Sequence, residues 1–195
     1  MDAPRLYLIT PKIVDPGFVA PFEAAIAAGE IACAWLRGVA ADLVRTLADI
    51  AQARGVACLV DDPKLAAEMD LDGVHIEGIG ARFDAALAAM KPGRIVGIGG
   101  LETRHEAMLA GEAGADYLMF DAPSLAETCE RIAWWAEIFN IPCIGEAARL
   151  EDIGALVNAG ADFIALCDAV WADAQGPASA VEAARRALAA HEPAA

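Results

Sequence analysis

The sequence is poor in basic residues and has no long apolar run. Its 195 residues include 14 lysines and arginines against 29 aspartates and glutamates, a formal net charge of −15. Nucleic acids and anionic membranes are normally bound by basic surfaces, so neither is an expected partner. No run of 18 or more apolar residues exists, and the opening MDAPRLYLITPK does not resemble a secretion signal. We therefore expect a cytoplasmic protein.

Paired cysteine motifs are also missing. The five cysteines form no CxxC pair, and four of them lie in apolar, strand-like runs: Cys33, Cys58, Cys143 and Cys167, with Cys129 as the fifth. Cysteine in such a run behaves as a small hydrophobic residue. We expect buried, reduced thiols rather than disulfides or a metal site.

Short apolar runs alternate with longer, alanine-rich amphipathic segments. The runs are continuously apolar, which is typical of parallel strands covered on both faces. They span residues 5–10, 33–37, 57–61, 73–77, 94–99, 117–121, 141–146 and 163–168. The segments between them have apolar residues at helical spacing, for example 18–28, 40–54, 103–113, 124–139, 149–159 and 178–190.

An internal repeat supports a regular strand and helix order. AGADYLMFDA (113–122) and AGADFIALCDA (159–169) lie 46 residues apart, and LDGVHIE (71–77) is a weaker copy. Each copy predicts a helix that ends in glycine, followed by an aspartate just before a strand.

Eight strand and helix units of about 23 residues predict an α/β fold, a compact (β/α)8 TIM barrel that forms a single domain over residues 1–195. With 57% hydrophobic residues the chain can bury a large core. The alternative is an open doubly wound sheet, but no complete GxGxxG follows the first strand. GIGARF (78–83) and GIGGLE (97–102) both lack the final glycine.

Chemistry in such a barrel takes place where strands end and loops begin. The residues at these positions are mostly acidic. We expect catalytic roles for Arg37 and Asp61. The candidate ligand-binding residues at this end are Glu77, Gly99, Gly100, His105, Asp121, Glu146 and Asp168.

Each candidate also has a purely structural explanation. Asp62 precedes Pro63, which is a typical helix start, so Asp62 is either a cap or a metal ligand. Asp61 needs a partner to offset its desolvation, either a bound ligand or a buried ion pair with Arg37. His75 lies in mid-strand, where a hydrogen-bonded core histidine is more common than a catalyst.

The segment TRHE has the spacing of a capping box, with Thr103 and Glu106 as its two partners. This leaves His105 in the first helical turn, where we expect it to face solvent. The glycines of GIGG before this helix have backbone N–H groups that could form an anion-binding nest.

The succession LYLIT, WLRG, LVDDPKLAAEMDLDGVHIEG, RIVGIGG, GEAGADYLMFD and NAGADFIALCDA resembles the thiamine-phosphate synthase family, which includes the TenI-type thiazole tautomerases, over nearly the whole chain. The resemblance implies a compact (β/α)8 barrel. It also implies an enzyme that joins a pyrimidine pyrophosphate to a thiazole phosphate with Mg²⁺ as cofactor. On this resemblance Asp62 corresponds to a metal-binding aspartate.

Several family motifs are altered. The family has a Gln-Leu-Arg-x-Lys motif at the end of the second strand. Here Trp35 replaces its glutamine and Val39 replaces its lysine, so Arg37 is the one polar residue of the motif that this sequence keeps. The second metal aspartate falls at Gly80 or Ala81. The catalytic histidine of the TenI type falls at Gly100 or Glu102, with His105 the only imidazole nearby.

The phosphate-binding positions of the family change as well. The loop after the sixth strand, DAPSLAET, has no lysine. The Gly-Gly pair after the seventh strand corresponds to Glu146 and Ala147, or keeps only Gly145 if the gap is placed differently, and the serine after the eighth strand is Asp168. A carboxylate about 4 Å from a phosphate opposes binding by on the order of 1 kcal/mol even in water.

These departures favour a diverged barrel protein that has lost synthase activity and binds a different small-molecule ligand or metal. The alternative is a genuine thiamine-phosphate synthase or thiazole tautomerase. A third possibility is a non-catalytic interaction protein, such as a homodimer that associates through the helix carrying Trp134 and Trp135, because adjacent tryptophans cannot share one helix face.

Overall fold

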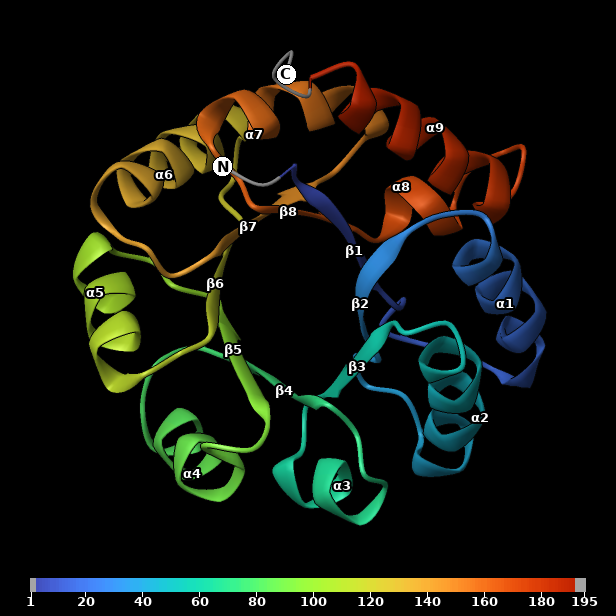
Figure 1. Ribbon diagram of the computed structural model, residues 1–195, viewed down its shortest axis with the longest axis horizontal. Helices are drawn as coiled ribbons and strands as arrows, with labels where there is room; N and C mark the ends of the chain where they lie inside the picture. The colour runs from blue at the N-terminus through green and yellow to red at the C-terminus, as the bar shows by residue number, and fades with distance from the viewer. Residues whose placement is uncertain (1–2, 192–195) are drawn as a thin grey trace.

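The computed structural model describes residues 3–191, which form a closed barrel of eight parallel strands in the order β1 to β8, surrounded by helices (Figure 1). The predicted (β/α)8 barrel is thereby confirmed. The strands are β1 (Arg5–Ile9), β2 (Ile31–Trp35), β3 (Ala57–Val60), β4 (Gly73–Glu77), β5 (Ile95–Gly99), β6 (Tyr117–Phe120), β7 (Cys143–Ala147) and β8 (Phe163–Leu166).

The helices form the outer ring of the barrel. They are η1 (Pro16–Phe18), α1 (Val19–Ala27), α2 (Ala41–Gln52), α3 (Pro63–Glu68), α4 (Ala81–Met90), α5 (Arg104–Ala113), α6 (Leu125–Ile138), η2 (Leu150–Asp152), α7 (Ile153–Ala159), α8 (Asp168–Trp171) and α9 (Pro177–Ala189). In the part of the chain that the structure describes, none of them has the length and apolar character needed to cross a membrane.

Most predicted elements lie within two residues of their observed positions, and two differ in an informative way. Strand β2 begins at Ile31 rather than Cys33, because Leu6 of β1 pairs with Ile31 before a register shift. The predicted helix over 149–159 is divided into η2 and α7. Asp152 at this junction accepts a hydrogen bond from the Arg149 backbone N–H at 3.1 Å.

The repeated aspartate ties neighbouring strands together. Each copy stands directly before an even-numbered strand, and its Oδ2 accepts the backbone N–H of a residue on the preceding odd-numbered strand. The pairs are Asp72 with Cys58 at 2.8 Å, Asp116 with Val96 at 2.7 Å and Asp162 with Cys143 at 2.8 Å. A buried N–H left unpaired would cost about 1–3 kcal/mol, so these carboxylates stabilise the amino end of the barrel.

The predicted glycine stops are confirmed in two of the three repeat copies. Gly114 and Gly160 end α5 and α7 with φ near 101°, a left-handed conformation that glycine adopts without a steric penalty. The third copy differs, because α3 is followed by Asp70 with φ 52°. An aspartate tolerates this conformation better than most residues other than glycine.

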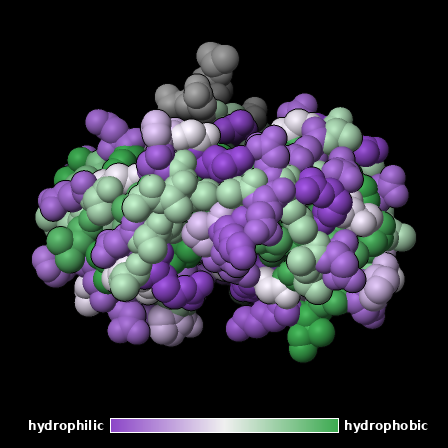
Figure 2. All heavy atoms as spheres, turned by 90° about the horizontal axis from the view of Figure 1, so that it is seen from below, coloured by the Kyte–Doolittle hydropathy of each residue, from purple (hydrophilic) through white to green (hydrophobic). Residues whose placement is uncertain are grey.

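Two cores are separated by the barrel wall. Inside the barrel, large side chains such as Tyr7, Trp35 and Tyr117 pack with Leu59 and Ile144. Outside, the remaining strand side chains pack against the helices. The face shown in Figure 2 mixes hydrophilic and apolar side chains.

The adjacent tryptophans of α6 have different surroundings, as their spacing requires. Trp135 is fully buried, and its Nε1 donates to the Ile141 carbonyl at 2.8 Å. Trp134 is partly buried and lies under the Arg104 guanidinium, 5.0 Å from its ring centroid. Both rings thus have partners within the chain.

Candidate functional site

The carboxyl ends of the strands bring most of the predicted site residues to one end of the barrel, which we call the mouth. Its floor is formed by Trp35 at the end of β2, His75 and Glu77 on β4, and Gly99 at the end of β5. Arg37 follows β2 by two residues. Asp61, Asp121, Glu146 and Asp168 reach the mouth from β3, β6, β7 and the start of α8.

Both carboxylate oxygens of Asp61 accept hydrogen bonds from other residues of the protein. Its Oδ1 accepts the Trp35 indole N–H at 2.7 Å, and its Oδ2 accepts the backbone N–H of Gly38 at 2.6 Å. Arg37 is therefore not its ion-pair partner, contrary to one of the two expectations from sequence. Asp61 holds Trp35 and the loop after β2 in place, so it acts on the site through other groups.

Asp62 is the N-cap of α3. Its Oδ1 accepts the backbone N–H of Lys64 at 2.8 Å, and Pro63 occupies the first helical turn. This confirms that Asp62 caps the helix, one of the two roles considered for it. A capping carboxylate of this kind contributes about 1 kcal/mol to stability.

The Arg37 guanidinium has few hydrogen-bond partners in the structure. Its Nη2 donates to the sulfur of Cys167 at 3.4 Å, and a thiol is a weak acceptor. Its Nε is buried without a hydrogen-bond partner, and it forms no ion pair with a carboxylate within residues 3–191. The guanidinium carbon lies 5.3 Å from the centroid of the Trp35 ring, which positions it by a cation–π contact.

A chain of hydrogen bonds runs from the barrel interior to the mouth. The Tyr7 and Tyr117 hydroxyls are 2.9 Å apart, and the Tyr117 hydroxyl is 2.7 Å from His75 Nδ1. His75 Nε2 is buried and has no hydrogen-bond partner. The nearest acidic oxygen is Glu77 Oε1 at 3.5 Å. Burial raises the pKa of both phenols, so they remain neutral hydroxyl donors.

The acidic groups of the mouth differ in their ionisation. The contact with His75 lowers the pKa of Glu77 more than burial raises it, with further help from Arg37 and Lys12. Burial and the nearby Asp121 raise the pKa of Glu146. Glu77 is thus a carboxylate at neutral pH, while Glu146 holds its proton more tightly than a free glutamate.

Cys167 is not an activated nucleophile. Burial raises its thiol pKa to about 11, so little thiolate exists at neutral pH. The other buried cysteines, Cys33, Cys58 and Cys143, lie in the core as predicted, and Cys129 is partly buried.

The mouth does not fit the Mg²⁺ ion that the family resemblance implies. Residues 3–191 contain no group of three or more histidine, cysteine, aspartate or glutamate side chains arranged to hold a metal ion. Asp61 uses both oxygens internally, and one oxygen of Asp62 caps α3. No chemical step is therefore assigned to a protein-bound metal.

Two glycines at the end of β5 pack closely against the His75 and Glu77 side chains. A Cβ on Gly99 would lie 2.8 Å from His75 Nε2, and one on Gly100 would lie 2.6 Å from Glu77 Oε2. Glycine at both positions thus lets the backbone approach these two side chains. His105 is exposed on α5 behind the predicted capping box of Thr103 and Glu106, which is confirmed.

Sequence reasoning treated His75 as a core residue and did not consider Tyr117. His75 is indeed buried and hydrogen-bonded, as that interpretation expected. The inward direction of residues 75 and 77 on β4 could have been inferred from the two-residue period of a strand. The free edge of the imidazole depends on packing against Trp35, whose ring centroid lies 4.0 Å away, and no sequence pattern reveals that contact.

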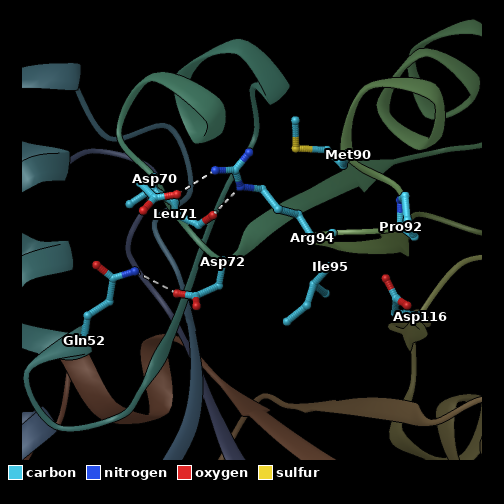
Figure 3. Close-up of a pocket in the computed structure, with 10 residues that line it drawn as sticks. Gln52, Asp70, Leu71, Asp72, Met90, Pro92, Arg94, Ile95 and Asp116 are labelled. Carbon is cyan, nitrogen blue, oxygen red and sulfur yellow. Dashed lines mark hydrogen bonds and ion pairs between the residues drawn. The ribbon is translucent and has the colours of Figure 1, made fainter.

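A cleft lies at the opposite, amino end of the barrel (Figure 3). It has a volume of about 890 Å³, but its polar groups bind each other. Arg94 donates to Asp70 at 2.7 Å and to the Leu71 carbonyl at 3.0 Å, and Gln52 donates to Asp72 at 2.9 Å. This cleft is a stabilising network, whereas the mouth retains unpartnered donors.

Comparisons with known proteins agree on one family. Residues 6–170 match the family model described as thiamine monophosphate synthase. The chain is 40% identical over 194 residues to the thiamine-phosphate synthase of Rhodospirillum centenum. This alignment covers 91% of this chain and 94% of the relative. It is 32% identical to that of Hyphomonas neptunium, with coverage of 92% and 91%.

Similar solved structures support the fold alone. The thiamine phosphate pyrophosphorylase from Pyrococcus furiosus superposes with a TM-score of 0.84 over 97% of each chain, at 22% identity. The 3-hexulose-6-phosphate synthase from Salmonella typhimurium superposes with a TM-score of 0.78 at 14% identity, over 96% of this chain and all of the other.

Proposed function

Because the chain belongs to the thiamine monophosphate synthase family, we propose that it is a thiamine-phosphate synthase that works at the barrel mouth. The observation that carries this proposal is the Arg37 guanidinium, which has a buried, unpartnered Nε and no carboxylate partner among residues 3–191. An arginine held in this way is suited to bind the oxygens of an anionic substrate. Near full-length relatives named thiamine-phosphate synthase support the same assignment.

The proposed reaction joins a pyrimidine carrying a diphosphate to a thiazole carrying a phosphate. The carbon–oxygen bond to the diphosphate breaks and the diphosphate leaves with the electron pair. The ring nitrogen of the thiazole donates its own pair to the same carbon. Arg37 would bind the departing oxygens, and Lys12 at the exposed rim would add a second positive charge.

The product ring carries a positive charge, which gives the acidic mouth a role in the reaction. The thiazole nitrogen becomes quaternary when the new bond forms, so a cation develops in the mouth. Glu77 is ionised and lies on the floor of this mouth. A carboxylate about 4 Å from a developing cation stabilises it by on the order of 1 kcal/mol at water's dielectric, and by more in a drier site.

A second candidate function is supported by the same acidic side chains. Asp121, Glu146 and Asp168 would oppose a diphosphate, and the loop after β6 supplies no lysine. Together with the absence of a metal-holding group in residues 3–191, this favours a diverged barrel that binds a cationic or neutral small molecule without synthase turnover.

Incubation of the purified chain with the pyrimidine diphosphate, the thiazole phosphate and Mg²⁺ separates the two candidates. A synthase forms thiamine phosphate and diphosphate in equal amounts, and both are measured by liquid chromatography. Absence of product, at protein concentrations that give clear turnover with the Rhodospirillum centenum relative, would overturn the synthase proposal. Thermal shifts with each substrate alone then show whether the second candidate holds, because a ligand that binds only the folded state raises the melting temperature.

A further inference from the structure

A cavity of about 280 Å³, which we call the amino-end cavity, enters the barrel interior at the end opposite to the mouth. Its lining includes the first or second residue of several strands, namely Arg5, Ala32, Ala57, Ile95 and Phe163. A cavity of about 150 Å³ is enough to hold benzene. The amino-end cavity therefore has room for a single aromatic ring.

The interior of the amino-end cavity is apolar. Leu59 and Ile144 line it together with the rings of Tyr7 and Tyr117. The two tyrosine hydroxyls bind each other at 2.9 Å, and the Tyr117 hydroxyl also binds His75 at 2.7 Å. A water molecule would find few free partners here, so the cavity favours an apolar group.

An irregularity at the start of β2 joins this cavity to a more polar hollow. Leu6 of β1 pairs with Ile31, but the next residue, Tyr7, pairs with Cys33, so Ala32 has no partner on β1. Extra residues of this kind are common at barrel rims, where they redirect the chain. Ala32 and Arg5 line both the amino-end cavity and a neighbouring hollow of about 360 Å³. The two spaces therefore meet at these residues.

The hollow is positively charged, although the whole chain has a formal net charge of −15. Arg5 and Arg185 line it against one acid, Glu30. The Arg5 guanidinium lies over the Phe163 ring, 4.9 Å from its centroid. The stem of Arg185 packs on Gly29, where a Cβ would lie 2.6 Å from Arg185 Cδ.

Neither guanidinium is used in an internal polar contact. Within residues 3–191, the side chains of Arg5 and Arg185 form no hydrogen bond and no ion pair, unlike Arg94, Arg104 and Arg149. Their stems and planes are held by apolar and cation–π contacts, which leave the N–H groups free. Two free forks beside an apolar cavity complement a ligand with an anionic head and an apolar body.

We infer that the amino-end cavity and the adjoining hollow form one binding site for a small carboxylic acid with an aromatic ring. The ring occupies the apolar cavity, and the carboxylate binds Arg5 and Arg185, because the guanidinium fork matches the two carboxylate oxygens. A carboxylate carries a single charge, so it tolerates Glu30 better than a doubly charged phosphate would. This site is separate from the mouth and goes beyond the proposed function.

The test is isothermal titration calorimetry with phenylacetate, its neutral amide phenylacetamide, and acetate. We expect phenylacetate to bind the wild-type protein about tenfold more tightly than the amide, because the amide lacks the charge that Arg5 and Arg185 recognise. Acetate lacks the ring and should also bind at least about tenfold more weakly. No binding of phenylacetate, or equal affinities for the acid and the amide, would overturn the inference.

Charge variants assign the carboxylate to this hollow. Arg5→Gln should remove the preference for phenylacetate over the amide, whereas the control Arg186→Gln, on the same helix as Arg185 but outside the hollow, should retain it. Glu30→Gln should strengthen phenylacetate binding severalfold, because it removes a like charge. Unchanged binding in Arg5→Gln, or equal losses in Arg5→Gln and Arg186→Gln, would contradict the assignment.

A further pair of variants assigns the ring to the amino-end cavity. Ala57 packs against the barrel interior, so Ala57→Leu should fill part of the cavity and weaken phenylacetate binding at least about tenfold. The control Ala133→Leu adds the same side chain at an exposed position of α6 and should bind as the wild type does. Melting temperatures show that both variants are folded, and the charge variants test the site independently of them.

Arg37→Ala distinguishes this site from the mouth. It should bind phenylacetate as tightly as the wild type, because Arg37 lies at the other end of the barrel. Loss of binding in Arg37→Ala with retention in Arg5→Gln would place the acid at the mouth and overturn the inference. No synthase substrate enters these measurements, so their outcome does not depend on turnover.

Discussion

The two ends of strand β6 each carry an aspartate, and the two side chains have opposite surroundings. At the amino end, Asp116 accepts the Val96 backbone N–H at 2.7 Å and forms an ion pair with Lys91. At the carboxyl end, Asp121 is exposed and has no hydrogen bond or ion pair within residues 3–191. A similar contrast separates the amino-end cleft, where Arg94 and Gln52 bind Asp70 and Asp72, from the mouth, where Arg37 Nε and His75 Nε2 have no hydrogen-bond partner within residues 3–191. Paired polar groups stabilise the fold, and unpaired groups are available for ligands.

The largest effect is expected at the mouth. Arg37→Ala removes the guanidinium that lies over Trp35 and should reduce synthase turnover at least about 100-fold, roughly 2.7 kcal/mol of transition-state binding. The melting temperature should change little, because no ion pair is lost. The control is Arg54→Ala, which removes an exposed arginine near the amino end and should leave turnover unchanged. Equal losses in both variants would show that the free guanidinium of Arg37 has no special role.

The second effect tests the paired end. Asp116→Ala leaves the Val96 N–H and Lys91 without their acceptor and should lower the free energy of unfolding by about 1–3 kcal/mol. Asp121→Ala, just past the other end of β6, should change it by less than about 0.5 kcal/mol. Urea denaturation of both variants measures the difference. Similar values for the two would remove the contrast between the ends of β6.

The third effect concerns the helix cap at the edge of the mouth. Asp62→Ala should lower the free energy of unfolding by about 1 kcal/mol, because the Lys64 N–H loses its acceptor. Asp62→Asn keeps an acceptor and should recover most of this loss. If Mg²⁺ stabilises the wild-type protein but neither variant, Asp62 binds metal in addition to capping α3.

The smallest effect depends on pH. Burial and Asp121 raise the folded-state pKa of Glu146, so its contribution to stability is full in acid and is lost as the pH rises through that pKa. At neutral pH the ionised side chain is therefore unfavourable. Glu146→Gln should increase the free energy of unfolding by a few tenths of a kcal/mol at pH 7 and by less at pH 4. A stabilisation that grows in acid would contradict this account.

The fold could be predicted from sequence because its signals are local and repeated. Continuous apolar runs marked all eight strands, and the AGAD repeat marked the strand and helix units. The capping residues Asp62 and Thr103 were also predictable, since a cap depends on neighbours within three positions. The strand order then brought the predicted residues to one end of the barrel.

The roles of individual site residues could not be predicted in the same way. Asp61 binds Trp35 and Gly38, residues that are distant in sequence and meet it only in the closed barrel. The unpartnered nitrogen of His75 depends on the stack with Trp35 and the hydrogen bond to Tyr117, 42 positions away. Contacts of this kind follow from the register between strands, and a single sequence does not contain that information.

The aspartate ties have a consequence for how the chain could have arisen and how it could be rebuilt. They join β3 to β4, β5 to β6 and β7 to β8, whereas Glu30, which stands before β2, is exposed. Each of these three pairs of consecutive strands thus contains both partners of its aspartate–amide hydrogen bond. Exchange of such a pair between relatives would preserve these bonds, while a boundary placed between β5 and β6 would separate Asp116 from Val96.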